Sequence, residues 1–278
     1  MTQKHQLSLG EAQETLLIPL YGRAVETGKP RALLRDPKSV EMVAAIEYDF
    51  ARFDGIKSLL GTVLRTSLID WWVGAFLADH PAGTVVEIGA GLNTRFERLD
   101  NRQLSWVDVD LPDAMELRRR FFSETERRAM LAGSVLDPAW VEAVKARPGP
   151  YFFAVEAVLV YLPEPEVKQA LGLIAEHFPG ALVALDTSGR WIVANQDQHD
   201  AMSKVTARMA WGCDDPRELE QWGLGLRLRD SRDLSQLPAE LRRRLPLSSR
   251  VMLPIAKIRF RERFAKYKVN LYEVGRGS

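Results

Sequence analysis

One stretch constrains the fold of this chain more than any other: Val85–Arg95, with the sequence VVEIGAGLNTR. Its branched apolar residues are typical of a buried parallel strand. Gly89 and Gly91 permit a tight turn and a close approach of the backbone to a ligand. A helix that begins near Asn93 would direct its free N–H groups and the positive end of its dipole to that ligand. The pattern predicts a strand, a ligand-binding turn and a helix, the first unit of a doubly wound α/β fold.

A second apolar run, Trp106-Val107-Asp108-Val109-Asp110, ends in carboxylates about 19 positions after Gly91. In doubly wound folds a ribose-binding acid follows the glycine loop at roughly 20 residues. Asp108 and Asp110 lie on the same side of a strand, and one of them is enough to hold a ribose. Asp110 is the candidate, and capping of the following helix is its alternative role. We expect a nucleoside-containing cofactor at residues 87–110.

The residue types of this loop favour S-adenosylmethionine over a dinucleotide. A dinucleotide fingerprint has a third glycine where this chain has Thr94, and that glycine permits close packing of helix on strand. Glu87 can orient loop N–H groups or meet a cationic ligand, but it has no use beside a pyrophosphate. S-adenosylmethionine carries an adenosine, a sulfonium and an ammonium, and no phosphate. An oxidoreductase that uses a nicotinamide dinucleotide is the alternative on the same fold.

The hydrophobic periodicity along the chain predicts two parts that form one compact unit. Helical spacing without strands predicts an N-terminal helical cap over residues 1–80. Residues 81–278 are predicted to form a Rossmann-like, mostly parallel, doubly wound sheet with helices on both faces. Residues 190–222 are expected to be an insertion that lines the substrate pocket, and Tyr267–Val274 an antiparallel edge strand. The parallel strands are expected at 84–88, 104–109, 129–133, 151–155 and 181–185.

Composition excludes several kinds of site and partner. The net charge of +1 and the 46% apolar content are those of an ordinary globular chain and predict neither a nucleic acid nor a membrane as partner. Cys213 is the only cysteine, so an internal disulfide is excluded, and the four histidines lack metal-ligand spacing. We expect no metal. No window approaches the ~20 apolar residues of a membrane span, and no signal peptide stands at the N-terminus, so we expect a cytoplasmic protein.

Two charged residues in apolar surroundings are further candidates. Glu156 directly follows the apolar run Tyr151–Val155, where a carboxylate is costly unless it is paired. Its partner would be either an ammonium or sulfonium of a ligand or an arginine of the chain itself. Arg65 lies in an apolar helical segment, where its planar donors suit a ligand carboxylate. The alternative partners of Arg65 are Asp70 and Glu47.

A pocket for a second ligand is expected between the helical cap and the insertion. The candidate catalytic residues there are His199, a possible general base beside a carboxylate, and Tyr21. An exposed polar loop is the alternative setting of His199. Several aromatic residues suit a planar, largely apolar small molecule, and filling of the core is their alternative role. These candidate pocket walls are Tyr21, Tyr161, Trp191 and Trp211.

Six segments stand in order over residues 14–222. They are Glu14–Ala24 (ETLLIPLYGRA), Arg65-Thr66 with Ile69-Asp70, Val86–Arg95, Trp106–Pro112, Val155–Pro163 (VEAVLVYLP) and Ala210–Pro216 (AWGCDDP). As a set they resemble the leucine carboxyl methyltransferase-like superfamily, and within it the bacterial polyketide O-methyltransferase branch, that of the tetracenomycin carboxyl methyltransferase-like enzymes.

The resemblance implies a class I methyltransferase fold that uses S-adenosylmethionine and releases S-adenosylhomocysteine. It implies that Arg65 holds the methionine carboxylate and that Glu156 takes the methionine ammonium. Gly89 would line the methionine, and Asp110 would bind the ribose.

The chain departs from the family pattern at two places. Family members often have Asp-Leu after the third strand, near the adenine, and this chain reads Ser134-Val135-Leu136-Asp137. Ser134 or Asp137 would then substitute in the adenine contact. The family usually has glycine after the glutamate of the fourth motif, and Ala157 could narrow the donor end of the pocket.

The residues also bear on the acceptor. Methyl transfer from a sulfonium is an in-line displacement that needs the acceptor oxygen ~3–3.5 Å from the methyl carbon. A carboxylate, with a pKa near ~4, is ionised without help, whereas a phenol, near ~10, benefits from a general base. Because the sequence shows no strong base, it favours a carboxylate or an acidic phenol of a small aromatic or polyketide-like metabolite. A carboxylate at a protein C-terminus is the alternative acceptor.

Overall fold

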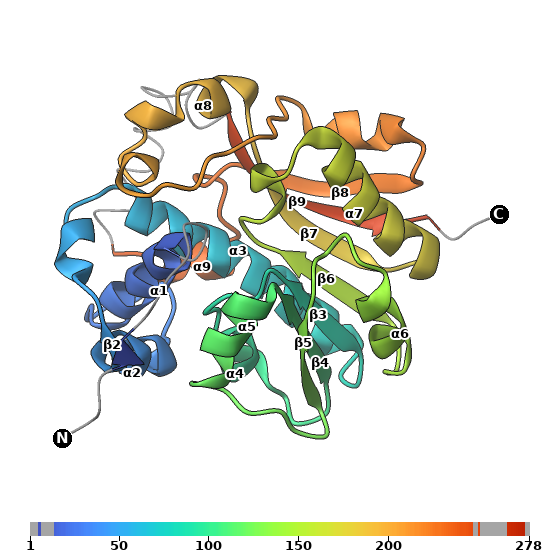
Figure 1. The fold of residues 1–278 in the computed structure, drawn as a ribbon, viewed down its shortest axis with the longest axis horizontal. Helices are drawn as coiled ribbons and strands as arrows, with labels where there is room; N and C mark the ends of the chain where they lie inside the picture. The colour runs from blue at the N-terminus through green and yellow to red at the C-terminus, as the bar shows by residue number, and fades with distance from the viewer. Residues whose placement is uncertain (1–4, 7–13, 247–249, 251–265, 276–278) are drawn as a thin grey trace.

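A seven-stranded sheet carries the fold in the computed structural model, which describes residues 5–6, 14–246, 250 and 266–275 (Figure 1). Its strands are β3 (Thr84–Ile88), β4 (Ser105–Asp110), β5 (Arg128–Ala132), β6 (Tyr151–Val155), β7 (Leu182–Ser188), β8 (Leu226–Arg232) and β9 (Tyr267–Val274). Their order is β5-β4-β3-β6-β7-β9-β8. The strands from β5 to β7 are parallel, and β9 runs antiparallel to both of its neighbours.

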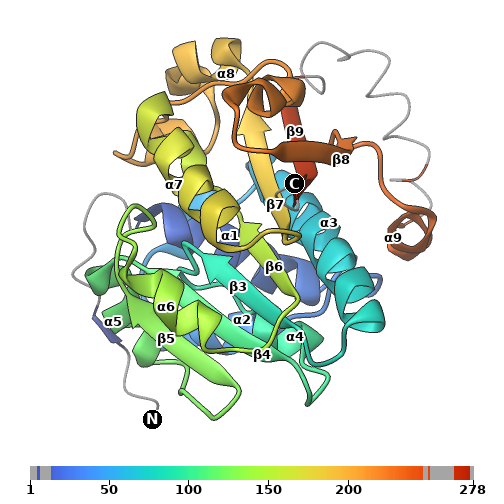
Figure 2. The ribbon, with the colours of Figure 1, turned by 90° about the vertical axis from the view of Figure 1, so that its right-hand side faces the viewer.

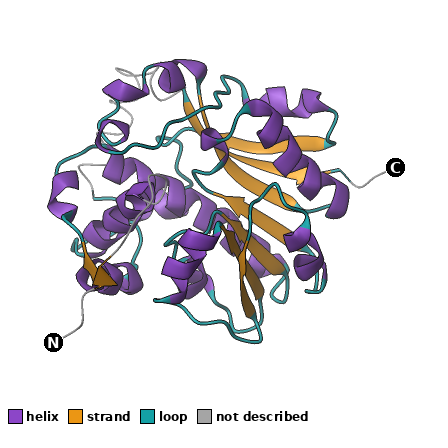
Figure 3. Ribbon diagram, viewed as in Figure 1, coloured by secondary structure: helices purple, strands orange, loops and turns teal. Residues whose placement is uncertain are grey.

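Helices surround this sheet (Figure 3). They are α1 (Glu14–Thr27), α2 (Pro37–Ala45), α3 (Ser58–Asp79), α4 (Arg95–Leu99), α5 (Pro112–Arg119), α6 (Ala139–Lys145), α7 (Glu164–His177), α8 (Arg190–Ala194) and α9 (Ala239–Arg244). Short 3-10 helices lie at Phe50–Phe53, Leu159–Tyr161, Gln196–Gln198, Met202–Lys204 and Pro216–Trp222. The short strands β1 (His5–Gln6) and β2 (Ile46–Glu47) pair with each other. Local sequence fixes helix starts: Asp36 accepts the N–H of Ser39 at 3.0 Å and Pro37 opens α2.

The fold class predicted from the sequence is confirmed, and each of the five predicted parallel strands is present. The prediction for Tyr267–Val274 is right in direction and wrong in place. This strand, β9, lies inside the sheet, between β7 and β8. The unpredicted strand β8 occupies the edge instead. Its exposed Arg227 and Arg229 alternate with less exposed residues, as expected of a strand with one face exposed to solvent.

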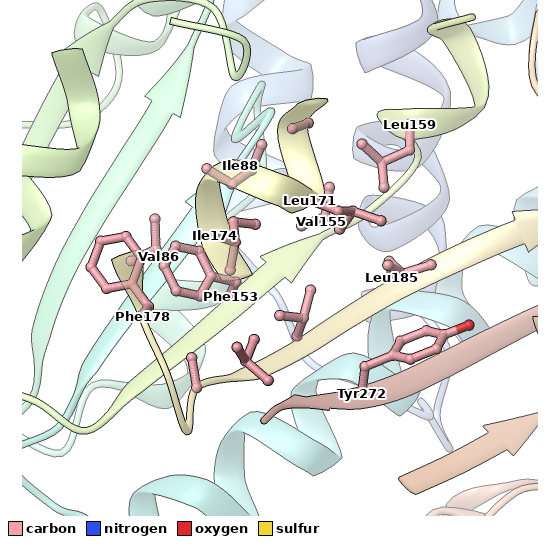
Figure 4. Close-up of a cluster of buried hydrophobic side chains, with 14 of the residues drawn as sticks. Val86, Ile88, Phe153, Val155, Leu159, Leu171, Ile174, Phe178, Leu185 and Tyr272 are labelled. Atoms are coloured by element: carbon pink, nitrogen blue, oxygen red, sulfur yellow. The ribbon is translucent and has the colours of Figure 1, made fainter. Parts of the chain in front are cut away.

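Alternate residues of the central strands pack into two separate cores. On one face Val86, Phe153 and Leu185 meet residues of α6 and α7, such as Ile174 (Figure 4). On the other face Val85, Trp106 and Phe152 meet α3. Figure 2 shows α3 on one side of the sheet and α6 and α7 on the other. This alternation follows from the two-residue period of a strand that is buried on both faces.

A third core joins the N-terminal helices to the end of the sheet that carries the glycine loop. Leu17 and Leu20 of α1 pack with Met42 of α2, with Leu92 of the glycine loop and with Met202. The helix α3, by contrast, lies directly on the sheet. No helix in the described part of the chain is long and apolar enough to cross a membrane.

The strand order reverses between β3 and β6, because β4 and β5 follow on one side and β7 on the other. Ligands of open α/β sheets bind beyond the carboxyl ends of the strands at such a switch point. The glycine loop follows β3 and Glu156 follows β6, so both stand there.

Candidate active site

The glycine loop needs its glycines for conformation and for space. Gly89 and Gly91 have φ of +64° and +44°, a region that other residues rarely adopt. A Cβ on Gly89 would lie 2.2 Å from Val158 Cγ2, and a Cβ on Gly91 would lie 2.7 Å from Leu16 Cδ2. The loop is therefore clasped by the segment after β6 and by α1.

Two arginines bind the carbonyl oxygens of this loop. Arg118 Nη1 donates to Gly91 O and Asn93 O, both at 2.8 Å, and to Ala90 O at 3.3 Å. Arg23 Nη2 donates to Leu92 O at 2.7 Å. Both side chains are buried. A run of charges such as Arg118-Arg119-Arg120 is usually a solvated helix face, but Arg118 is buried against the loop.

The two carboxylates at the end of β4 have different roles. Asp110 accepts the N–H of Gly91 at 2.5 Å and that of Leu111 at 2.7 Å, so it joins the glycine loop to β4. Asp108 is fully buried and binds Arg118 at 3.0 Å and Arg128 at 2.9 Å. Asp110 lines the cavity described below, which leaves it as the ribose candidate.

Arg65 of α3 and Glu156 after β6 pair with each other. Arg65 Nε donates to Glu156 Oε1 at 2.8 Å, and Thr66 Oγ1 donates to the same oxygen at 2.7 Å. Arg95 Nη2 donates to Glu156 Oε2 at 2.5 Å. Arg65 also donates to the Tyr267 hydroxyl at 3.0 Å and lies 4.0 Å from Asp186. Its partners are therefore these residues and Glu156, rather than Asp70 or Glu47.

These contacts belong to a buried charge network of four arginines and five carboxylates. Its members are Arg23, Asp36, Arg65, Asp70, Glu87, Arg95, Arg98, Glu156 and Asp186. Burial alone would raise the pKa of Glu156, but Arg65 and Arg95 outweigh it and lower that pKa to about 2. Burial dominates at Glu87, whose pKa rises to about 7 despite Arg95.

The segment after β6 is fixed by a second carboxylate. Ala157 has φ of +56°, which costs a non-glycine residue roughly 1–2 kcal/mol and explains why glycine suits this position. Asp186 of β7 accepts the N–H of Ala157 at 2.6 Å and the hydroxyl of Tyr267 at 2.8 Å. Tyr267 thus links Asp186 to Arg65 across the cavity wall.

One cavity of about 1240 Å³ collects most of the predicted site residues. Those that line it are Arg65, Gly89, Gly91, Asp110, Ser134, Val135, Glu156, Ala157, Tyr161, Trp191 and His199. Glu87, Leu136, Tyr21 and Trp211 do not. Glu87 lies beneath the glycine loop, bound to Arg95 and Asn93, and Leu136 packs against the core under α7.

Tyr21 and Trp211 differ from their expected place as pocket walls. Tyr21 packs on Phe50 with ring centroids 5.4 Å apart, and its hydroxyl donates to Asp54 at 2.5 Å. Trp211 is 3% exposed and packs near Trp222 in the core. For these two rings the alternative role, filling of a core, is what the structure shows, because both find apolar partners away from the cavity.

His199 lies on the cavity wall beside Asp200. Its Nδ1 accepts the N–H groups of Ala201 and Met202, each at 3.3 Å, and lies 3.7 Å from Asp200 Oδ1. Asp200 also accepts the N–H groups of Lys57 at 2.7 Å and of Ser58 at 3.3 Å. Asp200 therefore fastens the insertion to the N-terminus of α3.

Comparison with known proteins agrees with this geometry. The leucine carboxyl methyltransferase profile matches residues 17–175. The chain belongs to the leucine carboxyl methyltransferase family. A relative from Streptomyces glaucescens, the tetracenomycin polyketide synthesis O-methyltransferase TcmP, is 31% identical over 268 residues, 94% of this chain and 98% of that protein. The S-adenosyl-L-methionine-dependent methyltransferase dpfgK of Gibberella zeae is 29% identical over 82% of this chain and 84% of its own length.

Solved structures show the same fold as this leucine carboxyl methyltransferase family member. A candidate methyltransferase from Thermobifida fusca has a TM-score of 0.58 at 15% identity and covers 93% of this chain and 94% of its own. A DUF574 family protein from Streptomyces avermitilis has a TM-score of 0.55 at 13% identity, over 92% of this chain and 96% of that one. The chain is therefore a methyltransferase of the class that depends on S-adenosylmethionine.

Several residues of the site could not be identified from the sequence pattern. Arg95, Arg98, Arg118 and Tyr267 make contacts that depend on distant parts of the chain. One signal was available: Arg95 and Arg98 lie three apart directly after the glycine loop, and a buried carboxylate such as Glu87 or Glu156 requires cationic partners. No group of three potential metal ligands is found among the described residues.

Proposed function

We propose that this enzyme transfers the methyl group of S-adenosylmethionine to a carboxylate or acidic phenol oxygen of a small aromatic or polyketide-like molecule. One observation carries the proposal: a single cavity of about 1240 Å³ joins the glycine loop to an aromatic-lined second half. Pockets for one small ligand commonly measure ~300–1,000 Å³. The volume therefore supports a donor and an acceptor side by side.

The donor half fits S-adenosylmethionine group by group. Asp110 would accept the ribose hydroxyls, Arg65 would hold the methionine carboxylate and Glu156 the ammonium. When bound, the donor supplies an electrophilic methyl group on a sulfonium. Because Arg65 and Glu156 pair with each other at 2.8 Å, a head group with one charge of each sign would leave the net charge of the buried network unchanged.

His199 is not well placed to act as a general base. Since Nδ1 accepts two backbone N–H groups, the neutral ring carries its proton on Nε2 and acts there as a donor. Tyr21, bonded to Asp54, has its pKa raised to about 12. Both findings support an acceptor that is already ionised. We expect His199→Gln to keep turnover within a few-fold, and a loss of ~100-fold or more would contradict this proposal.

The names of the relatives support a small acceptor. TcmP is described as an O-methyltransferase of polyketide synthesis, and it matches 94% of this chain. A carboxylate at a protein C-terminus is the competing acceptor, and a peptide that ends in leucine tests it against a panel of aromatic acids and phenols. Transfer to the peptide alone would replace the proposed acceptor class.

Calorimetric titration of S-adenosylmethionine tests the donor site. We expect micromolar binding to the wild type and a loss of ~10-fold or more in Asp110→Ala and Asp110→Asn, since each removes a charged hydrogen-bond acceptor. The matched control is Asp79→Ala, an exposed carboxylate at the end of α3. Absence of binding to the folded wild type would overturn the proposal, and NAD would then be titrated.

A further inference from the structure

The second half of the cavity holds a lysine side chain, Lys266, that forms no ion pair with the described residues. This half lies beyond β7, on the far side of Glu156 from Asp110, and is lined by α8, by the insertion and by the start of β9. None of its described carboxylates pairs with this lysine. Asp54 accepts the Tyr21 hydroxyl and Asp200 caps α3. Asp186 accepts Ala157 N–H and the Tyr267 hydroxyl and lies 4.0 Å from Arg65 Nη1.

The cations of this half are placed differently. Arg208 lies 3.5 Å from Asp197. Lys57 and Lys266 make no ion pair with any residue in the described ranges. Of these two, Lys57 is exposed, whereas Lys266 is half-buried. The ammonium of Lys266 is therefore less well solvated than that of Lys57.

Lys266 is also held beside an aromatic ring. Its Nζ lies 4.2 Å from the centroid of the Trp191 ring, and its backbone carbonyl accepts the N–H of Gly189 at 2.6 Å. Trp191 is 45% exposed although it lines the cavity. A large apolar ring that stays open beside a fixed cation offers both an apolar surface and a charge to one ligand.

We propose that Lys266 and Trp191 form the acceptor subsite, which binds an aromatic acid or phenolate with its anionic group on Lys266 and its ring against Trp191. This inference rests on the proposed function and names the residues that select the acceptor. The pair also gives a reason for the preference: a neutral aromatic acceptor would leave the ammonium without a counter-ion in a half-buried position.

The test uses two probes with one ring, 2-naphthoate and its neutral amide 2-naphthamide. Both are titrated into the full chain with saturating S-adenosylhomocysteine. We expect 2-naphthoate to bind at least ~10-fold more tightly than the amide, the range of a charge-assisted hydrogen bond. Lys266→Met should remove this preference, Lys266→Arg should retain most of it, and Trp191→Leu should weaken both probes.

The matched control is Lys268→Met, two residues further along β9 and outside the cavity lining; its preference should equal that of the wild type. Equal binding of the two probes, or a preference that survives Lys266→Met, would overturn the subsite. Failure of the proposed function would give a different result, because S-adenosylmethionine itself would then not bind to the wild type. Melting temperatures of all variants verify that they are folded.

Discussion

The glycine loop depends on Arg118, a side chain that lies behind the loop and outside the cavity lining. Its guanidinium meets three carbonyl oxygens of the loop and the carboxylate of Asp108. Since the loop N–H of Gly91 is bonded to Asp110, Arg118 fixes one side of the turn and Asp110 the other. Arg118 is thus a positioning residue for the donor site.

We expect Arg118→Met to raise the KM for S-adenosylmethionine ~10- to 100-fold, since charged hydrogen bonds contribute about 1.5–3 kcal/mol, with a smaller change in kcat. Arg118→Lys should recover part of the loss. Arg120→Met, at a surface pair with Glu116, is the control. A lower melting temperature with an unchanged KM would show that Arg118 serves only stability.

The buried carboxyl of Glu87 should make the unfolding free energy depend on pH. Its pKa is raised from 4.5 to about 7, so between these pH values the folded state holds more protons than the unfolded state. The unfolding free energy therefore falls as pH rises through this window and levels off above pH 7.

The variant Glu87→Gln lacks this titration. The stability of the wild type relative to the variant should fall by up to about 3 kcal/mol from pH 4.5 to 7.5. Chemical denaturation of both proteins at several pH values measures it, and parallel profiles would contradict a raised pKa at Glu87.

How far single residues could be predicted depended on where their partners lie in the sequence. Gly89, Asp110 and Glu156 stand at the ends of predictable strands, and each lines the cavity. Arg118 sits in a run of three arginines that gives no sign of burial, because its partners come from the loop 25 to 28 residues earlier.

At the scale of elements, the insertion and α3 are joined through Asp200. The N-terminus of a helix leaves N–H groups without partners, and no side chain within α3 or at Lys57 caps it. Asp200 supplies the cap from 142 residues away in the sequence. Asp200 therefore connects the insertion to α3, and both line the proposed acceptor half of the cavity.

We expect Asp200→Ala to cost about 0.5–2 kcal/mol, the value of a helix cap, and to raise the KM for the acceptor while the Kd for S-adenosylmethionine stays unchanged. Asp197→Ala, whose side chain is 83% exposed, is the control. If the donor affinity falls as much as the acceptor affinity, the cap supports the whole cavity rather than its acceptor half.

The elements themselves were predictable where burial is continuous. The strands β3 and β6 are apolar runs, and their bounds match the expected ones. The strand β8 reads LRLRDSR, with charges at alternate positions, and its pairing depends on a segment far along the chain. Because β8 was not predicted, β9 was expected at the edge of the sheet. The sequence pattern of β9 alone does not show that a strand pairs with its second side.

At the scale of the molecule, the N-terminal segment and the sheet share a core. Leu68, Trp72 and Phe76 of α3 pack with Val85 and Phe152, so the residues of α3 bury much of one face of the sheet. We therefore propose that residues 1–80 and 81–278 unfold as one unit.

Calorimetry should show one transition with equal calorimetric and van't Hoff enthalpies. A fragment of residues 81–278 should be unfolded by circular dichroism and by proton NMR dispersion, because that face of the sheet would be bare. Two separate transitions, or a folded fragment, would contradict a single cooperative unit.

The interior position of β9 has a consequence for biosynthesis. A nascent chain can assemble the parallel strands once residue 188 has emerged, but β7 keeps an open edge until residue 274 follows, because β8 joins the sheet only through β9. Unpaired edges recruit other strands, including those of neighbouring nascent chains. Translation that stalls between these points should thus yield aggregates rather than a weakened enzyme, and chaperone dependence in cells should be greatest while residues 189–274 are being synthesised.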